Sequence, residues 1–168
     1  LAYDHAAKLE PTVPLPCDGP GLPESRFVVA DTLLRYDHGS GTADVLAGDA
    51  EGIAALLAGP LPSLPSPGAA ARPTNRFPPQ AEYETGVRRI KDLIRAGDAY
   101  QVVLSQRAER PTPASALQLY RALRRVNPSP YLFLLELDGL ALIGSSPETL
   151  VKCEGGRASL NPIAGTTQ

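Results

Sequence analysis

The feature that most constrains the fold of this chain is a concentration of proline between residues 60 and 79, where seven of twenty residues are Pro. Proline fixes its own φ angle and lacks a backbone N–H, so it is excluded from helix interiors and central strands. The same residues show almost no repeating apolar pattern. We therefore predict an extended surface linker at 60–79, which separates an N-terminal piece, residues 1–59, from a C-terminal piece, residues 80–168.

The composition excludes several classes of protein. Lys plus Arg total 16 against 18 Asp plus Glu, so no excess of charge favours a nucleic acid as partner. No run of eighteen apolar residues is present, and the first residues do not have the pattern of a signal peptide. We expect a cytoplasmic protein with no membrane span.

The two cysteines and two histidines are expected to be structural. Cys17 and Cys153 are far apart in a chain that does not need disulfides, and a reduced Cys packs like a small apolar side chain. His5 and His38 complete no metal-ligand spacing with them. The sequence therefore predicts no metal site.

The length permits a hydrophobic core. A compact chain of 17.7 kDa buries about 70% of the surface that it exposes when unfolded, provided that the domain is whole. Met is absent, so Leu1 is no initiator, and the first residues resemble the middle of an element. We expect the chain to be a part of a longer protein.

The N-terminal piece has the pattern of a hairpin followed by a helix. Residues 26–36 and 42–46 are rich in apolar and β-branched side chains and flank a loop that contains glycine. Asp49 is suited to cap a helix that ends near Gly59, because Ile53, Leu56 and Leu57 fall on one stripe.

The C-terminal piece begins with alternating helices and a strand. Tyr83, Val87, Ile90 and Ile94 recur at helical spacing, and Gly97 follows as a C-terminal cap. The charged residues on the other sides of this helix are interpreted as a solvated face. Residues 99–109 alternate as in a strand, and a second helix is predicted from Thr112 as N-cap, with Pro113 at its first position, to Asn127.

Two hairpins complete the pattern. Residues 131–137 and 140–144 flank Asp138-Gly139, and residues 150–153 and 157–160 flank Gly155-Gly156. Consecutive hairpins that are segregated from the helices predict an α+β fold with antiparallel sheets flanked by helices.

Glu148 is the local candidate for chemistry. It follows Ser145-Ser146-Pro147 where an apolar strand ends, a position that often carries function. A carboxylic acid there can act as general acid or base if burial raises its pKa. The alternative is a solvated turn residue, and Gly165-Thr166 is equally compatible with an ordinary turn.

Four segments together resemble component I of anthranilate synthase and its chorismate-using relatives. They are AGDAYQVVLSQ (96–106), NPSPYLF (127–133), SSPETLVK (145–152) and PIAGT (162–166), in this order. FVVADTLLRYDH (27–38) is similar to the N-terminal half of that family. The resemblance implies a layered sandwich of antiparallel sheets with the active site between its halves.

The resemblance also implies a reaction. Family members convert chorismate in the presence of Mg²⁺: a nucleophile adds to the ring as a hydroxyl leaves, and some members then eliminate pyruvate. A hydroxyl leaves more readily when it is protonated, and Glu148 matches the family's acid. Gly165 and the catalytic candidate Thr166 match a pair that lines the substrate site.

Two positions distinguish among family members. Relatives that add water have a lysine base where this chain has Gln101, whose amide cannot accept that proton, so ammonia from a glutamine amidotransferase subunit is the implied nucleophile. Aminodeoxychorismate synthases often have a lysine where this chain has Ala164. The resemblance thus favours anthranilate synthase in tryptophan biosynthesis over aminodeoxychorismate or isochorismate synthase.

A tryptophan site for feedback inhibition is also implied. Apolar walls with a few polar anchors suit an indole, and the alternative is a helix-to-strand turn packed as core. The matching residues are Asn127, Pro130, Tyr131, Leu132, Phe133 and Gly144.

The last residues depart from the family pattern. Thr167 stands where arginine is usual, and the acidic Mg²⁺ ligands that the family places further on are not identified in this chain. We therefore expect residues 1–168 alone to be inactive and, because strand edges would be unpaired, to self-associate. The alternative of another class is a non-catalytic remnant that binds a ligand or another subunit.

Overall fold

The computed structural model describes residues 2–15, 19–63 and 73–161. All bounds below are given in chain order. The elements are η1 Tyr3–His5, α1 Ala6–Leu9, β1 Leu33–Asp37, β2 Thr42–Ala47, α2 Ala50–Ala58, β3 Asn75–Phe77, α3 Gln80–Ala96, β4 Arg107–Glu109, α4 Ala116–Val126, β5 Tyr131–Leu137, β6 Leu140–Ser146, β7 Lys152–Glu154 and β8 Arg157–Ser159.

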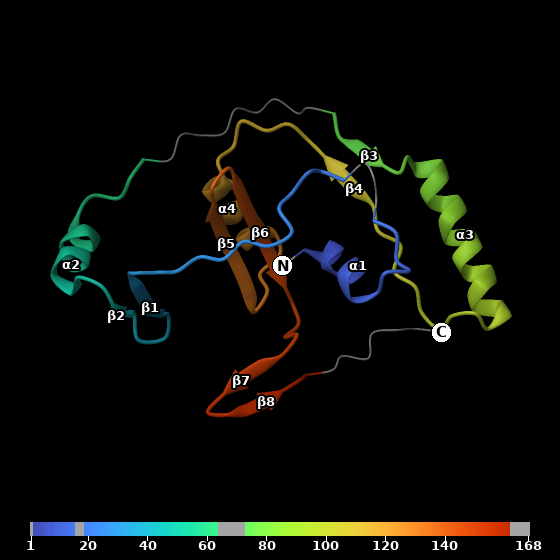
Figure 1. The fold of residues 1–168 in the computed structure, drawn as a ribbon. Helices are drawn as coiled ribbons and strands as arrows, with labels where there is room; N and C mark the ends of the chain where they lie inside the picture. The colour runs from blue at the N-terminus through green and yellow to red at the C-terminus, as the bar shows by residue number, and fades with distance from the viewer. Residues whose placement is uncertain (1, 16–18, 64–72, 162–168) are drawn as a thin grey trace.

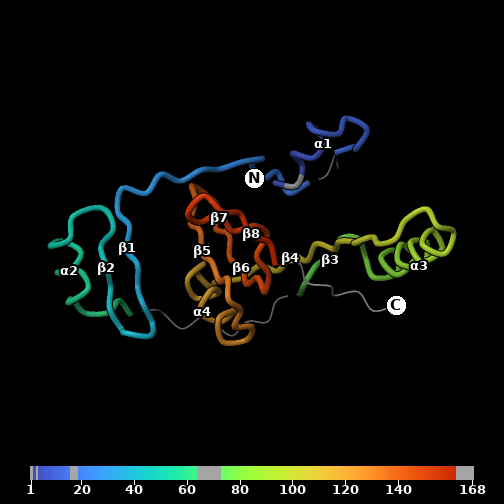
Figure 2. The backbone as a smooth tube through the Cα atoms, turned by 90° about the horizontal axis from the view of Figure 1, so that it is seen from below, coloured from blue at the N-terminus to red at the C-terminus, as the bar shows by residue number. Residues whose placement is uncertain are grey.

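The strands pair only with their neighbours along the described chain. They form four antiparallel sheets of two strands each, β1–β2, β3–β4, β5–β6 and β7–β8. Figure 1 shows these sheets spread along the molecule, with β5–β6 and α4 between the β1–β2–α2 unit and the β3–β4–α3 unit. The same separation is visible from below in Figure 2. The predicted α+β class with antiparallel sheets is confirmed.

The predicted caps of two helices are confirmed. The Asp49 side chain accepts a hydrogen bond from the backbone N–H of Glu51 (3.1 Å) and so begins α2. Gly97 ends α3 in the left-handed conformation (φ 86°), and its N–H bonds back to the carbonyls of Leu93 and Ile94.

The predicted start of α4 is wrong by a few residues. Thr112 accepts only the N–H of Ala114 (3.1 Å), and the helix begins after Ser115. Ser115 accepts the N–H of Gln118, whose side chain in turn accepts the N–H of Ser115. This reciprocal capping box satisfies two backbone donors where the Thr112 start would satisfy one, which explains the later boundary.

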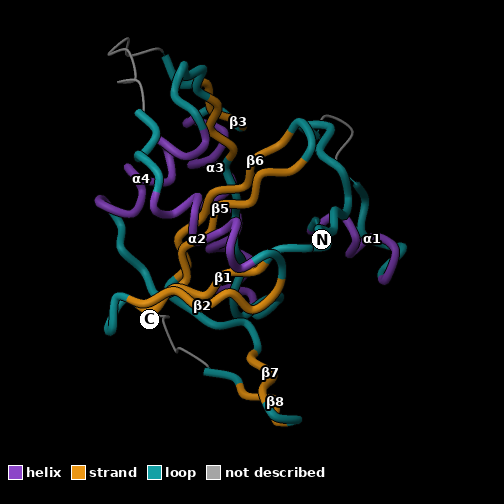
Figure 3. The backbone as a smooth tube through the Cα atoms, turned by 90° about the vertical axis from the view of Figure 1, so that its left-hand side faces the viewer, coloured by secondary structure: helices purple, strands orange, loops and turns teal. Residues whose placement is uncertain are grey.

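Both C-terminal hairpins form where the glycine turns predict them. Gly139 (φ 70°) turns β5 into β6, and Leu137 pairs with Leu140. Gly155 and Gly156 both have positive φ (55° and 75°), as a two-residue turn of type I′ requires. The strands β7 and β8 are shorter than predicted, and Figure 3 shows this hairpin projecting away from β5–β6.

The long strand predicted at 99–109 is mostly absent, since only Arg107–Glu109 pairs, as β4, with β3. Residues 99–106 instead run along α3, where the Tyr83 hydroxyl donates to the carbonyl of Leu104 (3.4 Å). A Cβ at Gly86 would lie 2.9 Å from Leu104, so the small residue allows this close approach. No strand among the described residues lies beside this segment, so its alternating pattern does not lead to sheet hydrogen bonds.

The predicted linker contains an edge strand that the proline content did not reveal. Its strand β3, at residues 75–77, pairs with β4. Arg76 donates to the side-chain carbonyl of Gln106 (3.0 Å), and the Gln106 amide donates to the carbonyl of Pro78 (3.2 Å). The end of the predicted linker is therefore tied to the C-terminal piece.

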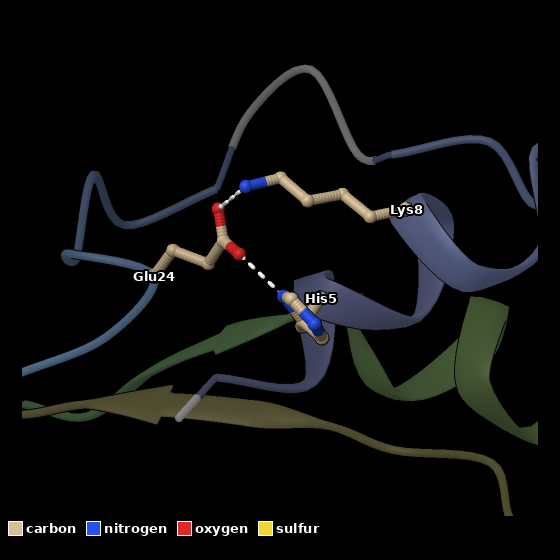
Figure 4. A network of polar contacts seen from close by, with 3 residues as sticks. All are labelled: His5, Lys8 and Glu24. Atoms are coloured by element: carbon tan, nitrogen blue, oxygen red, sulfur yellow. Dashed lines mark hydrogen bonds and ion pairs between the residues drawn. The ribbon is translucent and has the colours of Figure 1, made fainter.

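The N-terminal segment is held by a small polar network (Figure 4). Glu24 accepts hydrogen bonds from His5 Nδ1 (2.6 Å) and Lys8 Nζ (2.5 Å), 19 and 16 residues away along the chain. The bond from His5, then that from Lys8, holds the pKa of Glu24 below its usual value. His5 thus has the structural role that the sequence predicts.

None of the described residues is fully buried, so the core that a whole domain of this size could form is absent from them. The chain exposes 14,511 Å², whereas a compact protein of 17.7 kDa exposes about 8,000 Å². Cys153, expected to pack as an apolar side chain, is an exposed free thiol. The physical reason is that each two-stranded sheet has at most one face covered by a helix.

Candidate active site

Glu148 lies on a short turn that begins where β6 ends. The Ser146 hydroxyl donates to the carbonyl oxygen of Glu148 (3.1 Å) and accepts the Glu148 N–H (3.4 Å). A serine hydroxyl that bonds to the backbone two residues later closes a tight local turn. The position at a strand end agrees with the prediction from the sequence.

The turn borders an open pocket of about 400 Å³. The pocket joins the end of β6 to the residues that follow β8. Leu150 and Leu160 form apolar walls, and the polar lining residues are Ser146, Glu148, Thr149 and Asn161. Apolar walls with a few polar groups suit a small ring that carries oxygen substituents. The Glu148 side chain is exposed at this pocket.

A second contact holds the turn on its other side. Thr149 Oγ1 donates a hydrogen bond to the hydroxyl oxygen of Tyr131, the first residue of β5. Thr149 is half-buried, whereas its neighbours Glu148 and Leu150 are exposed. Sequence reasoning did not single out Thr149, Leu160 or Asn161, because their proximity to Glu148 depends on how two hairpins follow each other.

An aromatic face lies on β5–β6 beside this turn. Phe133 is opposite Gly144 in the strand register, and its ring covers the space that a side chain at 144 would occupy. Tyr131 lies two residues away, on the same face of the strand. Both rings are about half exposed, at 46% for Tyr131 and 42% for Phe133. Three residues predicted for tryptophan thus share one face.

The remaining residues predicted for tryptophan lie elsewhere. Leu132 alternates to the opposite face, where its cross-strand neighbour Ser145 donates to the carbonyl of Asn127 (2.7 Å) at the end of α4. This is the face that α4 covers. Pro130 is exposed. The structure therefore divides the predicted set between the two sides of the hairpin.

Of the other predicted catalytic and substrate-binding residues, the structure describes only Gln101. Gln101 is exposed in the extended segment beside α3 and is not among the described residues that line the pocket at Glu148. Ala164, Gly165 and Thr166 lie outside the described residues.

Within the described parts of the chain, no three or more His, Cys, Asp or Glu residues are grouped so as to hold a metal ion. Hard cations such as Mg²⁺ need several oxygen ligands in one shell. The described residues therefore do not fit a Mg²⁺ site.

No helix in the described ranges is both long enough and apolar enough to cross a membrane.

Comparisons with known proteins agree with the motifs. A family described as chorismate binding enzyme matches residues 1–168. The chain is 40% identical to anthranilate synthase component 1 of Thermus thermophilus, over 98% of this chain and 38% of that protein. It is 37% identical to anthranilate synthase component 1 of Streptomyces coelicolor, over 99% of this chain and 37% of that one.

A solved structure is similar over most of the chain. The crystal structure of anthranilate synthase component I from Streptococcus pneumoniae matches with a TM-score of 0.79 and 28% identity, covering 93% of this chain and 39% of that chain. The chain thus spans somewhat less than two fifths of the length of the relatives that it matches.

Proposed function

This chain belongs to the chorismate binding enzyme family, and from that premise we propose that it supplies the proton-donating part of an anthranilate synthase. The observation that carries the proposal is the position of Glu148. It stands at the end of β6, is held by Ser146, and borders a pocket with two leucine walls.

The proposed reaction consumes chorismate and ammonia and produces anthranilate, pyruvate and water. The lone pair of ammonia forms a C–N bond to the ring while the C–O bond of the ring hydroxyl breaks. Glu148 donates a proton to this hydroxyl, which departs as water. The new ammonium group returns one proton to the Glu148 carboxylate. The ring then loses a proton and its C–O bond to the enolpyruvyl group breaks; the methylene carbon of that group takes up a proton, so it leaves as pyruvate and the ring becomes aromatic. Atoms and charges balance across the two steps.

The described residues supply only part of this site. Catalytic sites normally exclude water from the reacting groups, and Glu148 is exposed. We propose that Gly165 and Thr166, which match the substrate-lining pair of the family, also contact the ring. Ala164 stands where aminodeoxychorismate synthases often have a lysine, and Gln101 has no basic group to activate water, so ammonia is the proposed nucleophile.

For the longer protein to which this chain corresponds, we propose chorismate as substrate, a glutamine amidotransferase subunit as the source of ammonia, Mg²⁺ as cofactor, feedback inhibition by tryptophan, and a cytoplasmic location. The aromatic face of Tyr131 and Phe133 supports the tryptophan proposal, because an indole stacks favourably on such rings.

One observation favours a second candidate function, a remnant that binds a ligand or subunit without turnover. The described residues have no buried core, and each sheet leaves strand edges unpaired, which favours self-association. Calorimetric titration distinguishes the enzyme from the remnant: binding of tryptophan but not of chorismate supports the remnant. Sedimentation measures the association of copies.

The enzyme proposal is tested by grafting residues 1–168 into the matching region of the Thermus thermophilus relative and measuring anthranilate by its fluorescence, with ammonia and Mg²⁺ supplied. In an active graft, Glu148→Gln should lower kcat about 100-fold or more, because the amide cannot donate a proton to the leaving hydroxyl. Glu136→Gln, an exposed residue on β5, is the matched control. Undiminished turnover in Glu148→Gln would show that the assignment is wrong.

A further inference from the structure

Tyr131 is placed at the same end of the β5–β6 hairpin as the turn that carries Glu148. In the strand register Tyr131 is opposite Ser146, the last residue of β6. Cross-strand partners project from the same face of a sheet, so the phenol ring and the Ser146 side chain lie side by side. Ser146 in turn bonds to the backbone of Glu148 on both its N–H and its carbonyl.

The Tyr131 hydroxyl also contacts Thr149, the residue that follows Glu148 in the chain. It accepts the hydrogen bond of Thr149, although the two residues are 18 positions apart in the chain. Glu148 is therefore bracketed by two hydroxyl contacts: Ser146 holds the turn to the end of β6, and Tyr131 with Thr149 holds it to the start of β5. Thr149 is half-buried in this contact and lines the same pocket as Glu148.

We propose that Tyr131 and Thr149 are positioning residues that aim the Glu148 carboxyl into the pocket. The inference rests on the proposed role of Glu148 as proton donor and extends it to the residues that hold it. A proton donor works only when it is kept within hydrogen-bond reach of the departing oxygen. An exposed glutamate on a turn is free to sample many directions, and the Tyr131–Thr149 bond limits the directions that its backbone allows.

The first test needs no turnover and uses the whole chain. The backbone amide and side-chain carboxyl signals of Glu148 are followed by NMR across a pH titration in Tyr131→Phe, Thr149→Val and the double variant. Tyr131→Phe keeps the ring and removes only the hydroxyl. Tyr36→Phe, in the separate β1–β2 sheet, is the matched control. Thr149→Ser keeps a hydroxyl and is the conservative rescue.

The expected result is a change in both Glu148 signals in each single variant, with no further change in the double variant. The signals should stay at their original positions in Tyr36→Phe and return toward them in Thr149→Ser. Equal effects of the two singles and of the double identify one shared bond. Unchanged Glu148 signals in Tyr131→Phe, or additive changes in the double variant, would overturn the proposal.

The second test is kinetic and uses the active graft. Tyr131→Phe and Thr149→Val should each lower kcat about fivefold to tenfold and leave KM within about twofold, since one neutral hydrogen bond aims the acid without binding the substrate. If kcat is unchanged in an active graft, the positioning proposal fails and the proposed function stands. If the graft forms no anthranilate, the proposed function fails, and the NMR comparison still decides whether Tyr131 holds the turn.

Discussion

The hairpins β5–β6 and β1–β2 are built from similar signals but differ in what covers them. Both pair in antiparallel register around a glycine-containing turn, and each has a helix next to it in the chain. On β5–β6, Leu132, Leu134 and Ile143 are half-buried on the face that α4 covers. On β1–β2, every residue is exposed except the half-buried Val45.

The difference separates two contributions to stability. Turn conformations and helix-cap hydrogen bonds act locally, and they are present in both hairpins and their adjacent helices. Burial of a sheet face requires a second element at the right distance and angle, and only β5–β6 has one among the described elements. We therefore expect the α4–β5–β6 unit to be the most stable part of the described chain, and the β1–β2 hairpin to open independently.

The largest expected effect is on the covered face. Leu134→Ala removes a half-buried side chain between β5 and α4 and should lower the free energy of unfolding of this unit by about 2 kcal/mol. Leu34→Ala, at an exposed position of β1, should cost less than about 0.5 kcal/mol. Hydrogen exchange measures both hairpins in one sample. Equal costs would contradict the distinction between them.

The next effect concerns the aromatic face. Gly144→Ala places a methyl group where the Phe133 ring lies, so the ring must move, and we expect a cost of about 1 to 1.5 kcal/mol. In a Phe133→Leu background the same change should be nearly neutral, because the obstructing ring is gone. Chemical denaturation of the two pairs gives the comparison. A similar cost in both backgrounds would show that it comes from the backbone of β6 and not from the clash with the Phe133 ring.

A smaller effect is expected at the helix caps. Ser115→Ala removes the capping box of α4 and should cost about 1 kcal/mol, a loss that β5–β6 shares because α4 packs on it. Asp49→Ala removes the cap of α2, which leaves the β5–β6 amides unaffected. Hydrogen exchange in β5–β6 distinguishes the two. Ser115→Thr retains a capping hydroxyl and serves as the control.

The smallest effect is a pH dependence at the β1–β2 turn. The backbone N–H groups of Ser40 and Gly39 bond to Asp37 and hold its pKa below its usual value. The folded pKa is depressed, so the contribution is complete above about pH 4, the ordinary value of an aspartate, and is lost as the pH falls toward the lower folded pKa. The amide shifts of Gly39 and Ser40 report this loss. Asp37→Asn should abolish this pH dependence. If the amide shifts of the Asp37→Asn variant still change over the same pH range, another group causes the change.

The local parts of the fold were predictable because their causes lie within a few residues. Asp49 and Gly97 cap their helices as predicted, and the glycines at 139, 155 and 156 have the positive φ angles that their turns need. The start of α4 was misplaced because Thr112 and Ser115 are both capable caps, and only the reciprocal bond with Gln118 favours the second.

The candidate site was predictable only in part. Glu148 was recognised from its motif, and its position after a strand followed from the hairpin pattern. Its neighbour Thr149 belongs to the same motif but was not assigned a role, and Leu160 and Asn161 carry no signal in the sequence, since they approach through the way the two hairpins follow each other. Strand alternation places Leu132 on the opposite face of β5 from Tyr131 and Phe133, and this could be predicted. Which of the two faces α4 covers depends on packing.

The sequence by itself determined the family, the caps of α2 and α3, and the glycine turns, because each depends on nearby residues or on linked motifs. Only the tertiary structure decided that residues 99–106 lie along α3 without pairing, that Tyr131 reaches Thr149, and that no described residue is buried. These outcomes depend on contacts between distant segments, whose free energy comes from surfaces that meet only after the chain has folded.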